Sequence, residues 1–157
     1  MDIRIREATR DDQKVAHGWA NDPDSMRMNA KRGEVPLDTF GRLFAELLHD
    51  KDVLLLIFEG MCDGGWAPIA QARLDADGEM SIFIDAAYRG RKLATPIILA
   101  SIEFAGDKLE LPRIVAKIRL ENTPSIKAFE RAGFEAAREL VYKGCACIEY
   151  EYVVRST

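Results

Sequence analysis

The alternation of apolar and polar residues divides the chain into short strands and helices. Residues 3–7 and 79–85 alternate with a period of two, which is the pattern of a strand with one buried face. Residues 53–59, with the sequence VLLLIFE, are almost entirely apolar and too short for a surface helix, so they predict a central strand. Further strands are predicted at residues 69–75, 113–120, 135–144 and 147–154.

Apolar residues at helical spacing, together with capping residues, predict about four helices. The first is capped by Thr9, with Asp12 in a capping-box position, and it ends at the turn that contains Pro23. The others are predicted at residues 36–50, 92–105 and 122–134. The element order is therefore β-α-α-β-β-β-α-β-α-β-β. This order predicts a mixed α/β fold, with a central sheet of about seven strands, in one domain that spans residues 1–157.

The composition excludes several classes of function. A net charge of −4 argues against a nucleic-acid binder, which usually has a basic excess. Apolar runs stay below the roughly 18 residues of a membrane helix, and the N-terminus is charged at once, so neither a membrane span nor a secretory signal is expected. The cysteine count of three, without a C-x-x-C pair, predicts reduced thiols in a cytoplasmic protein. Cys145 and Cys147 are interpreted as packing residues of one strand face, and no metal site is predicted.

A basic loop precedes the most apolar helix. Arg89, Arg91 and Lys92 stand within four residues, and Pro96 must lie in the first turn of the helix because proline lacks an amide proton. The backbone N–H groups of residues 90–94 then have no helical partner, and the helix dipole makes their end positive. Such an arrangement favours an anion, and a phosphate-bearing ligand is the natural candidate. The alternative is a solvated basic loop without a ligand.

Two motifs in this half of the chain resemble those of the GNAT N-acetyltransferase superfamily. The loop motif Arg/Gln-x-x-Gly-x-Gly/Ala falls on Arg89, Gly90, Arg91, Lys92, Leu93 and Ala94. The second motif, Asn-x-x-[Ala/Ser]-x-x-x-[Tyr/Phe]-x-x-x-Gly-Phe, falls on Asn122, Ser125, Phe129, Gly133 and Phe134. Both motifs occur in the right order and in a strand-helix-strand-helix context.

The resemblance implies that acetyl-CoA is a co-substrate. Its pyrophosphate would bind the loop at residues 89–94, and its pantetheine arm would lie along the strand at Ile82, Phe83 and Ile84. A splayed gap between this strand and residues 113–118 would admit the arm. Asn122, Ser125 and Phe129 would then face the cofactor, with Asn122 near the thioester.

The chain departs from the superfamily pattern at two positions. Lys92 stands where the loop motif has its first Gly, so either it adopts a strained positive φ or the loop takes ordinary angles. Phe129 stands where many relatives have the Tyr that protonates the departing thiolate. Ser125, Tyr88 or water would have to supply that proton instead.

The acceptor must be an amine, and an ammonium has to lose a proton before it can attack. Glu79, Ser81 and Phe83 share one face of their predicted strand, which makes Glu79 the first candidate for the base. The alternative for Glu79 is a solvated carboxylate at a strand end. His49 is a weaker candidate beside Asp50.

The segment that begins at Trp19 resembles the WxNDPxxR segment of a GNAT subgroup that includes amino-sugar N-acetyltransferases of pseudaminic acid biosynthesis. Asn21, Arg27 and Asn29 would offer hydrogen bonds to a polar acceptor, and Trp19 would offer a flat face. The alternative is a turn that ends a helix, with Trp19 in the core.

These observations predict an enzyme that acetylates a primary amine of a small polar acceptor, with a nucleotide-linked amino sugar as first choice. Alternatives are a protein N-terminus or an amino-acid-like amine, and a non-catalytic acyl-CoA-binding module. No nucleic-acid or membrane partner is expected. A homodimer is possible through the strand at residues 147–154, on the expectation that this strand lies at the edge of the sheet.

Overall fold

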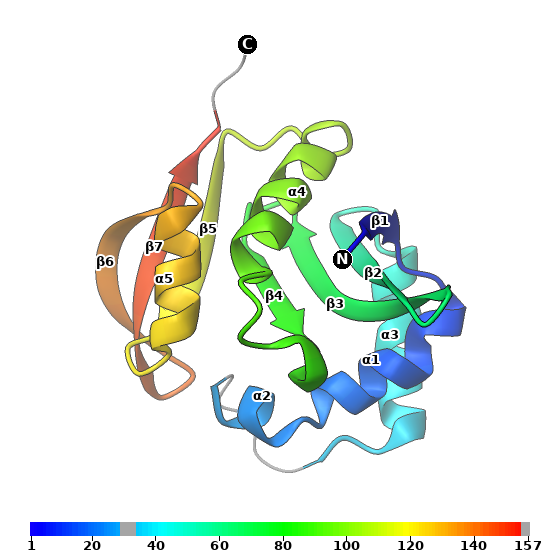
Figure 1. Ribbon diagram of the computed structural model, residues 1–157. Helices are drawn as coiled ribbons and strands as arrows, with labels where there is room; N and C mark the ends of the chain where they lie inside the picture. The colour runs from blue at the N-terminus through cyan, green and yellow to red at the C-terminus, as the bar shows by residue number, and fades with distance from the viewer. Residues whose placement is uncertain (29–33, 155–157) are drawn as a thin grey trace.

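The computed structural model describes residues 1–28 and 34–154, apart from the side chains of residues 25, 27 and 28. Its seven strands form two antiparallel sheets (Figure 1). The first sheet has the order β1-β2-β3-β4, formed by β1 (Ile3–Glu7), β2 (Val53–Cys62), β3 (Gly65–Asp75) and β4 (Met80–Ile84). The second has the order β5-β7-β6, formed by β5 (Arg113–Arg119), β6 (Glu135–Tyr142) and β7 (Cys145–Val153).

The helices follow the predicted order with one addition. They are α1 (Gln13–Ala20), α2 (Pro23–Met28), α3 (Leu37–His49), α4 (Ala94–Gly106) and α5 (Thr123–Arg131), with 3-10 turns η1 (Arg10–Asp12) and η2 (Ala86–Tyr88). The predicted Thr9 capping box is present. Helix α1 ends before Pro23 as expected, but Pro23 then begins the short helix α2, because proline fits the first turn of a helix.

The two sheets are joined at one end of β4 and β5. Glu79 and Val115 form an isolated parallel bridge, and the Val115 N–H donates to the Gly78 carbonyl oxygen at 2.8 Å. Gly78 has φ 87°, and a Cβ at this position would collide with the Arg113 carbonyl oxygen. Beyond this junction, β4 and β5 form no further pairing in the described chain. The expected single sheet is therefore two sheets, with the splayed gap between β4 and β5.

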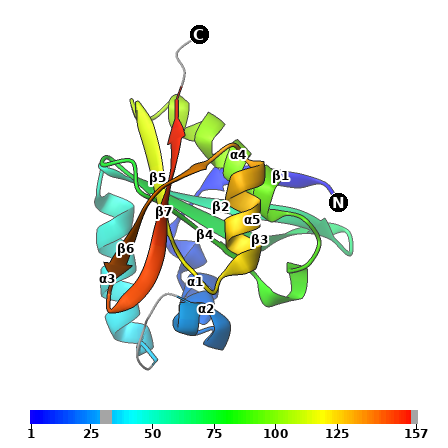
Figure 2. The same ribbon diagram turned by 90° about the vertical axis from the view of Figure 1, so that its left-hand side faces the viewer.

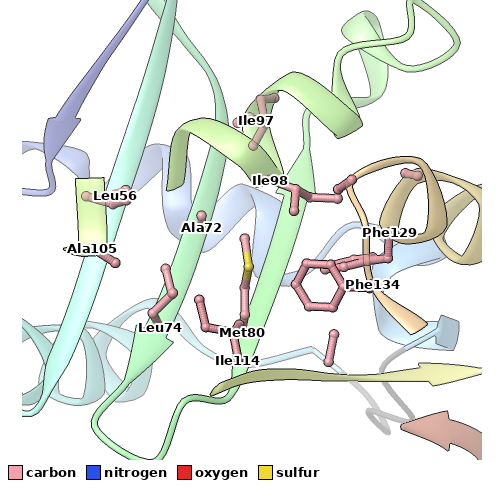
Figure 3. Close-up of a cluster of buried hydrophobic side chains, with 14 of the residues drawn as sticks. Leu56, Ala72, Leu74, Met80, Ile97, Ile98, Ala105, Ile114, Phe129 and Phe134 are labelled. Atoms are coloured by element: carbon pink, nitrogen blue, oxygen red, sulfur yellow. The ribbon is translucent and has the colours of Figure 1, made fainter. Parts of the chain in front are cut away.

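The main core lies between the two sheets and helices α4 and α5 (Figure 3). Successive residues of β2 point to opposite faces of the first sheet, and each face packs against a different cluster. Leu54, Leu56 and Phe58 belong to the main core, whereas Leu55 packs with Ala16 and Phe44 in a smaller cluster under α1 and α3.

The C-terminal strand β7 is not an edge strand. It lies between β5 and β6 in the second sheet, as Figure 1 shows, because the β6–β7 hairpin places β7 against β5 and leaves β6 outside. Figure 2 views the same sheet from the side of β6. The prediction of an edge at residues 147–154 was therefore wrong. The homodimer stays a prediction, and β7 cannot form it by adding a strand.

Candidate active site

The loop of residues 89–94 connects η2 to α4, and α4 begins at Ala94 with Pro96 in its first turn, as predicted. Leu93 is the N-cap residue and makes no side-chain capping hydrogen bond. Within the described residues, the backbone N–H groups of residues 90–95 have no protein acceptor. Free amides at the positive end of a 13-residue helix fit a phosphate group of acetyl-CoA.

Lys92 adopts the left-handed conformation of the glycine that it replaces in the motif. Its φ is 60°, and that of Gly90 is 75°. The alternative of ordinary loop angles is therefore wrong. The motif geometry is kept here at the cost of backbone strain, because a Cβ crowds the following carbonyl in this region.

The three basic side chains of the loop have different surroundings. The Arg89 guanidinium lies 3.0 Å from Asp22 and 3.3 Å from Asp24, and it also donates to the Ile84 carbonyl oxygen at 3.0 Å. Arg91 lies over the Tyr88 ring, 5.1 Å from its centroid, and Lys92 is exposed. Arg89 thus ties the loop to the start of α2, and the geometry favours Arg91 and Lys92 as the phosphate ligands.

The gap between β4 and β5 leaves one edge of β4 without a neighbouring strand. Ile82, Phe83 and Ile84 pair with β3 on their other edge. Asn122 follows the C-terminal end of β5, where its side-chain oxygen accepts the Ser125 N–H at 3.4 Å and caps α5. A free strand edge of this kind can pair with the amide groups of an extended ligand.

Phe129 belongs to the main core. It is 2% exposed, and its ring meets that of Phe134 edge to face, with 4.9 Å between centroids (Figure 3). The ring therefore packs against apolar side chains of the main core. The proposed contact between Phe129 and the cofactor stays a prediction.

Tyr88 has a partner away from the gap. Its hydroxyl lies 2.9 Å from the Cys62 sulfur at the end of β2. This hydrogen bond raises the pKa of Tyr88 above its usual value, which makes the phenol a weaker acid. Tyr88 is therefore a poorer candidate for the proton donor, and the roles of Ser125 and water stay predictions.

A cavity of about 390 Å³ lies on the face of the first sheet that α1 and α3 cover. Its walls also include residues of β3, β4, β5 and the β6–β7 hairpin. We name it the acceptor cavity. Its walls include Trp19, Phe44, Gln71, Glu79, Phe83 and Lys117. Cys145 and Cys147 also line it, and burial raises the pKa of the Cys147 thiol, so this thiol stays protonated.

Trp19 lies in the core, as one alternative predicted, and its contact with an acceptor stays a prediction. It is 5% exposed, and its indole N–H donates to the Asp85 carboxylate at 2.8 Å, so it is part of the core. Its ring also lines the acceptor cavity, 5.5 Å from that of Phe83. The wall of the cavity is therefore a fixed aromatic surface.

Of the other predicted acceptor residues, the structure places the side chain of Asn21 alone among the described residues. Asn21 binds the backbone of Val35 through both ends of its amide and lies 2.9 Å from the His17 ring nitrogen, so it holds the chain after α1 and is not part of the cavity lining. The side chain of Arg27, and Asn29 as a whole, lie outside the described residues.

Glu79 lies at the junction of the two sheets and lines the acceptor cavity with Ser81 and Phe83. Its carboxylate is 3.6 Å from the Lys117 ammonium, and its backbone N–H donates to Asp75 at 3.0 Å. Glu79 is thus not simply a solvated strand-end residue. Its role as the base stays a prediction that this position supports.

Sequence reasoning missed the polar residues of the cavity that come from other strands: Gln71, Arg73, Lys117, Arg119, Tyr142 and Lys143. The period of two on residues 69–75 and 113–119 places the polar residues of each strand on one face. That signal does not say which faces meet. The Gln71 side-chain oxygen is buried without a hydrogen-bond partner in the described chain.

The described residues contain neither a membrane-spanning helix nor a cluster of metal-binding side chains. No helix within residues 1–28 and 34–154 is long and apolar enough to cross a membrane. The same residues contain no group of three or more His, Cys, Asp or Glu side chains placed to hold a metal ion.

A family model described as an acetyltransferase (GNAT) domain matches residues 2–135. Spermidine N(1)-acetyltransferase of Escherichia coli K12 is 22% identical, with 98% of this chain and 83% of the relative covered. The crystal structure of Vibrio cholerae spermidine N-acetyltransferase with CoA and spermine has a TM-score of 0.86 at 18% identity, covering 96% of this chain and 95% of that one. Aminoglycoside acetyltransferase AAC(6')-Ib with coenzyme A has a TM-score of 0.77 at 19% identity, covering 97% and 95%.

These similarities confirm the superfamily predicted from the two motifs, and the fold with it. The relatives are spermidine and aminoglycoside acetyltransferases, so they do not support the finer assignment to the amino-sugar subgroup. Because the family model covers most of the chain, the protein belongs to the GNAT acetyltransferases and is an acetyl-CoA-dependent N-acetyltransferase.

Proposed function

We propose that the protein acetylates a primary amine of a small acceptor held in the acceptor cavity, with acetyl-CoA in the gap between β4 and β5. The observation that carries this proposal is the position of β4. Residues 79–83 line the cavity, while the free edge of the same strand borders the gap. Donor and acceptor would therefore meet across one strand.

On the donor side, we expect the amides of residues 90–94 to bind the pyrophosphate, with Arg91 and Lys92 supplying positive charge. Arg89 would act by positioning the loop against Asp22 and Asp24. The pantetheine amides would pair with Ile82–Ile84, whose free edge runs from this loop toward the junction at Glu79. This direction brings the thioester toward the cavity.

On the acceptor side, Glu79 would take the proton that the ammonium must lose, because it lines the cavity near the end of the gap. Lys117, at 3.6 Å, fixes the direction of the carboxylate. The buried oxygen of Gln71 lacks a donor within the described residues, and a second N–H or O–H group of the acceptor would satisfy it. Ser125 or water would return a proton to the departing thiolate.

The acceptor is a small polar amine. The relatives are named for spermidine and aminoglycosides, and the structural relative from Vibrio cholerae holds spermine. The Trp19 segment favours a nucleotide-linked amino sugar, and an amino-acid-like amine is the further candidate. Use of acetyl-CoA and three free cysteines support a cytoplasmic location.

The test is thiol release from acetyl-CoA with each of these amines, and mass spectrometry to find the acetylated product. Gln71→Leu should raise KM for the amine and leave KM for acetyl-CoA unchanged, because Gln71 lines only the acceptor side. Binding of acetyl-CoA without thiol release from any amine would contradict the proposal.

A further inference from the structure

The acceptor cavity carries more basic than acidic side chains. Its charged lining consists of Arg73, Lys117, Arg119 and Lys143 against Asp75 and Glu79. Excess positive charge is unexpected for an enzyme whose relatives are named for a polyamine and for aminoglycosides, which are cations at neutral pH.

Both carboxylates of the cavity lining, those of Asp75 and Glu79, already have partners within the protein. Glu79 pairs with Lys117 at 3.6 Å. One oxygen of Asp75 accepts the backbone N–H groups of Asp77 and Glu79, each at 3.0 Å. A cationic acceptor would therefore find each carboxylate already bound to another group.

Two basic side chains of the cavity lining have no carboxylate partner among the described residues. Arg73 and Lys143 form no ion pair within the described residues, although Lys143 lies over the Tyr142 ring, 5.3 Å from its centroid. Arg119, by contrast, pairs with Glu121.

The nearest carboxylate on β7 does not change this balance. Glu149 is the register partner of Lys117, but it lies outside the cavity lining. It binds Arg138 and Arg113, each at 3.3 Å. The cavity therefore keeps a local excess of positive charge.

We propose that the acceptor carries an anionic group, a carboxylate or a phosphate, which Arg73 and Lys143 bind in the acceptor cavity. This inference rests on the proposed function and names its substrate class. Arg73 and Lys143 are both exposed, so water screens their attraction for an anion without abolishing it, whereas a polyamine would add like charges to the cavity. Arginine suits both anions because its guanidinium forms paired hydrogen bonds with their oxygens.

The strand geometry orients such an acceptor. Gln71 and Arg73 are two residues apart on one face of β3, so their Cα atoms are about 6.6 Å apart. They lie opposite Phe83 and Ser81 of β4, respectively. With its amine at Glu79 and its anion at Arg73, the acceptor would lie along β3 and β4 and extend toward the aromatic wall of Trp19 and Phe83.

The first experiment compares acceptors that differ in one anionic group. Glucosamine 6-phosphate is measured against glucosamine, and γ-aminobutyrate against its amide, with spermidine as the cationic probe. We expect the anionic member of at least one pair to have the higher kcat/KM by roughly 4- to 25-fold, the product of about 2- to 5-fold for each of two exposed ion pairs. The responding pair distinguishes phosphate from carboxylate.

The second experiment removes the cations. Arg73→Gln and Lys143→Gln should each reduce that preference toward one by raising KM for the anionic acceptor. Lys14→Gln is the matched control, because Lys14 is exposed on α1 and is not part of the cavity lining. Acetyl-CoA affinity, measured by calorimetry, should stay the same in all three variants and shows that they are folded.

Equal or better use of the neutral acceptors or spermidine would overturn the inference while leaving the proposed function intact. So would an anion preference that survives both substitutions. Calorimetric binding of an anionic acceptor that depends on Arg73 and Lys143, without any thiol release, would support the anion site and contradict the proposed acetyl transfer.

Discussion

Replacing Lys92 by glycine should raise thermal stability and weaken acetyl-CoA binding at the same time. Lys92 has φ 60°, a left-handed conformation that costs a residue with a Cβ roughly 1–2 kcal/mol. Glycine removes that cost. It also has more conformational freedom in the unfolded chain, which lowers the free energy of unfolding by about 0.4–1 kcal/mol. The net gain is about 0.5–1 kcal/mol, which corresponds to a rise in Tm of about 1–4 °C for a chain of this size.

The loss of binding follows from the exposed ammonium of Lys92. An ion pair between an exposed lysine and a phosphate is screened by water and contributes about 0.5–1 kcal/mol. Removing it should raise Kd for acetyl-CoA by about 2- to 5-fold. The backbone amides of the loop remain in the variant and should keep most of the affinity.

The assay combines differential scanning calorimetry without ligand and isothermal titration with acetyl-CoA. Lys92→Ala is the matched control, because alanine loses the charge but keeps the Cβ and its strain. We expect both variants to lose the same affinity and only the glycine variant to gain Tm. A glycine variant no more stable than the alanine variant would refute the strain, and unchanged Kd in both would refute the phosphate contact.

Three further predictions concern the base, a buried carboxylate and the core aromatic ring. Glu79→Gln should lower turnover more at neutral than at high pH, since amines deprotonate unaided as pH rises; a pH–rate profile parallel to that of the parent would remove Glu79 from the mechanism. Burial raises the pKa of Asp12, but hydrogen bonds from Arg6, both at 2.8 Å, outweigh it and hold the pKa below its usual value. Asp12→Asn should therefore lower the free energy of unfolding by about 1–3 kcal/mol above about pH 5, and this difference should begin to shrink near about pH 4 and disappear only as the pH falls through the depressed pKa of Asp12, whereas the exposed Asp11→Asn should show little effect in urea unfolding. Phe129→Tyr should lower Tm, because a buried hydroxyl without a partner costs about 1–3 kcal/mol, and should leave turnover unchanged; faster turnover would place this ring at the thioester.

The sequence was most informative where local chemistry decides the structure. The Thr9 capping box, the position of Pro96 in the first turn of α4 and the turn at Gly144 follow from backbone hydrogen bonds and φ preferences over a few residues. The left-handed Lys92 was one of two alternatives, and the resemblance to the loop motif pointed to the correct one. Strand and helix types were therefore predictable before any contact between them was known.

Long-range pairing accounts for what the sequence did not predict. The position of β7 inside its sheet depends on which side of the hairpin meets β5, and a period of two is the same for either side. The attachment of Arg89 to Asp22 joins residues 67 positions apart. The basic residues of the acceptor cavity come from β3, from β5 and from the β6–β7 turn, which are distant in sequence, so only the fold shows that they share a site.

Among the described residues, the two sheets pair only at Glu79 and Val115, so the stability of the folded protein should depend on its donor substrate. The edge of β4 that faces the gap has no neighbouring strand in the described chain beyond Glu79 and Val115. A pantetheine arm in the gap would supply the missing hydrogen bonds and would bind the folded chain alone. A ligand at a hundred times its Kd stabilises a protein by about 2.7 kcal/mol, so opening and proteolysis should slow when acetyl-CoA is plentiful. The amount of enzyme in a cell would then rise and fall with the supply of acetyl groups, without any dedicated regulator.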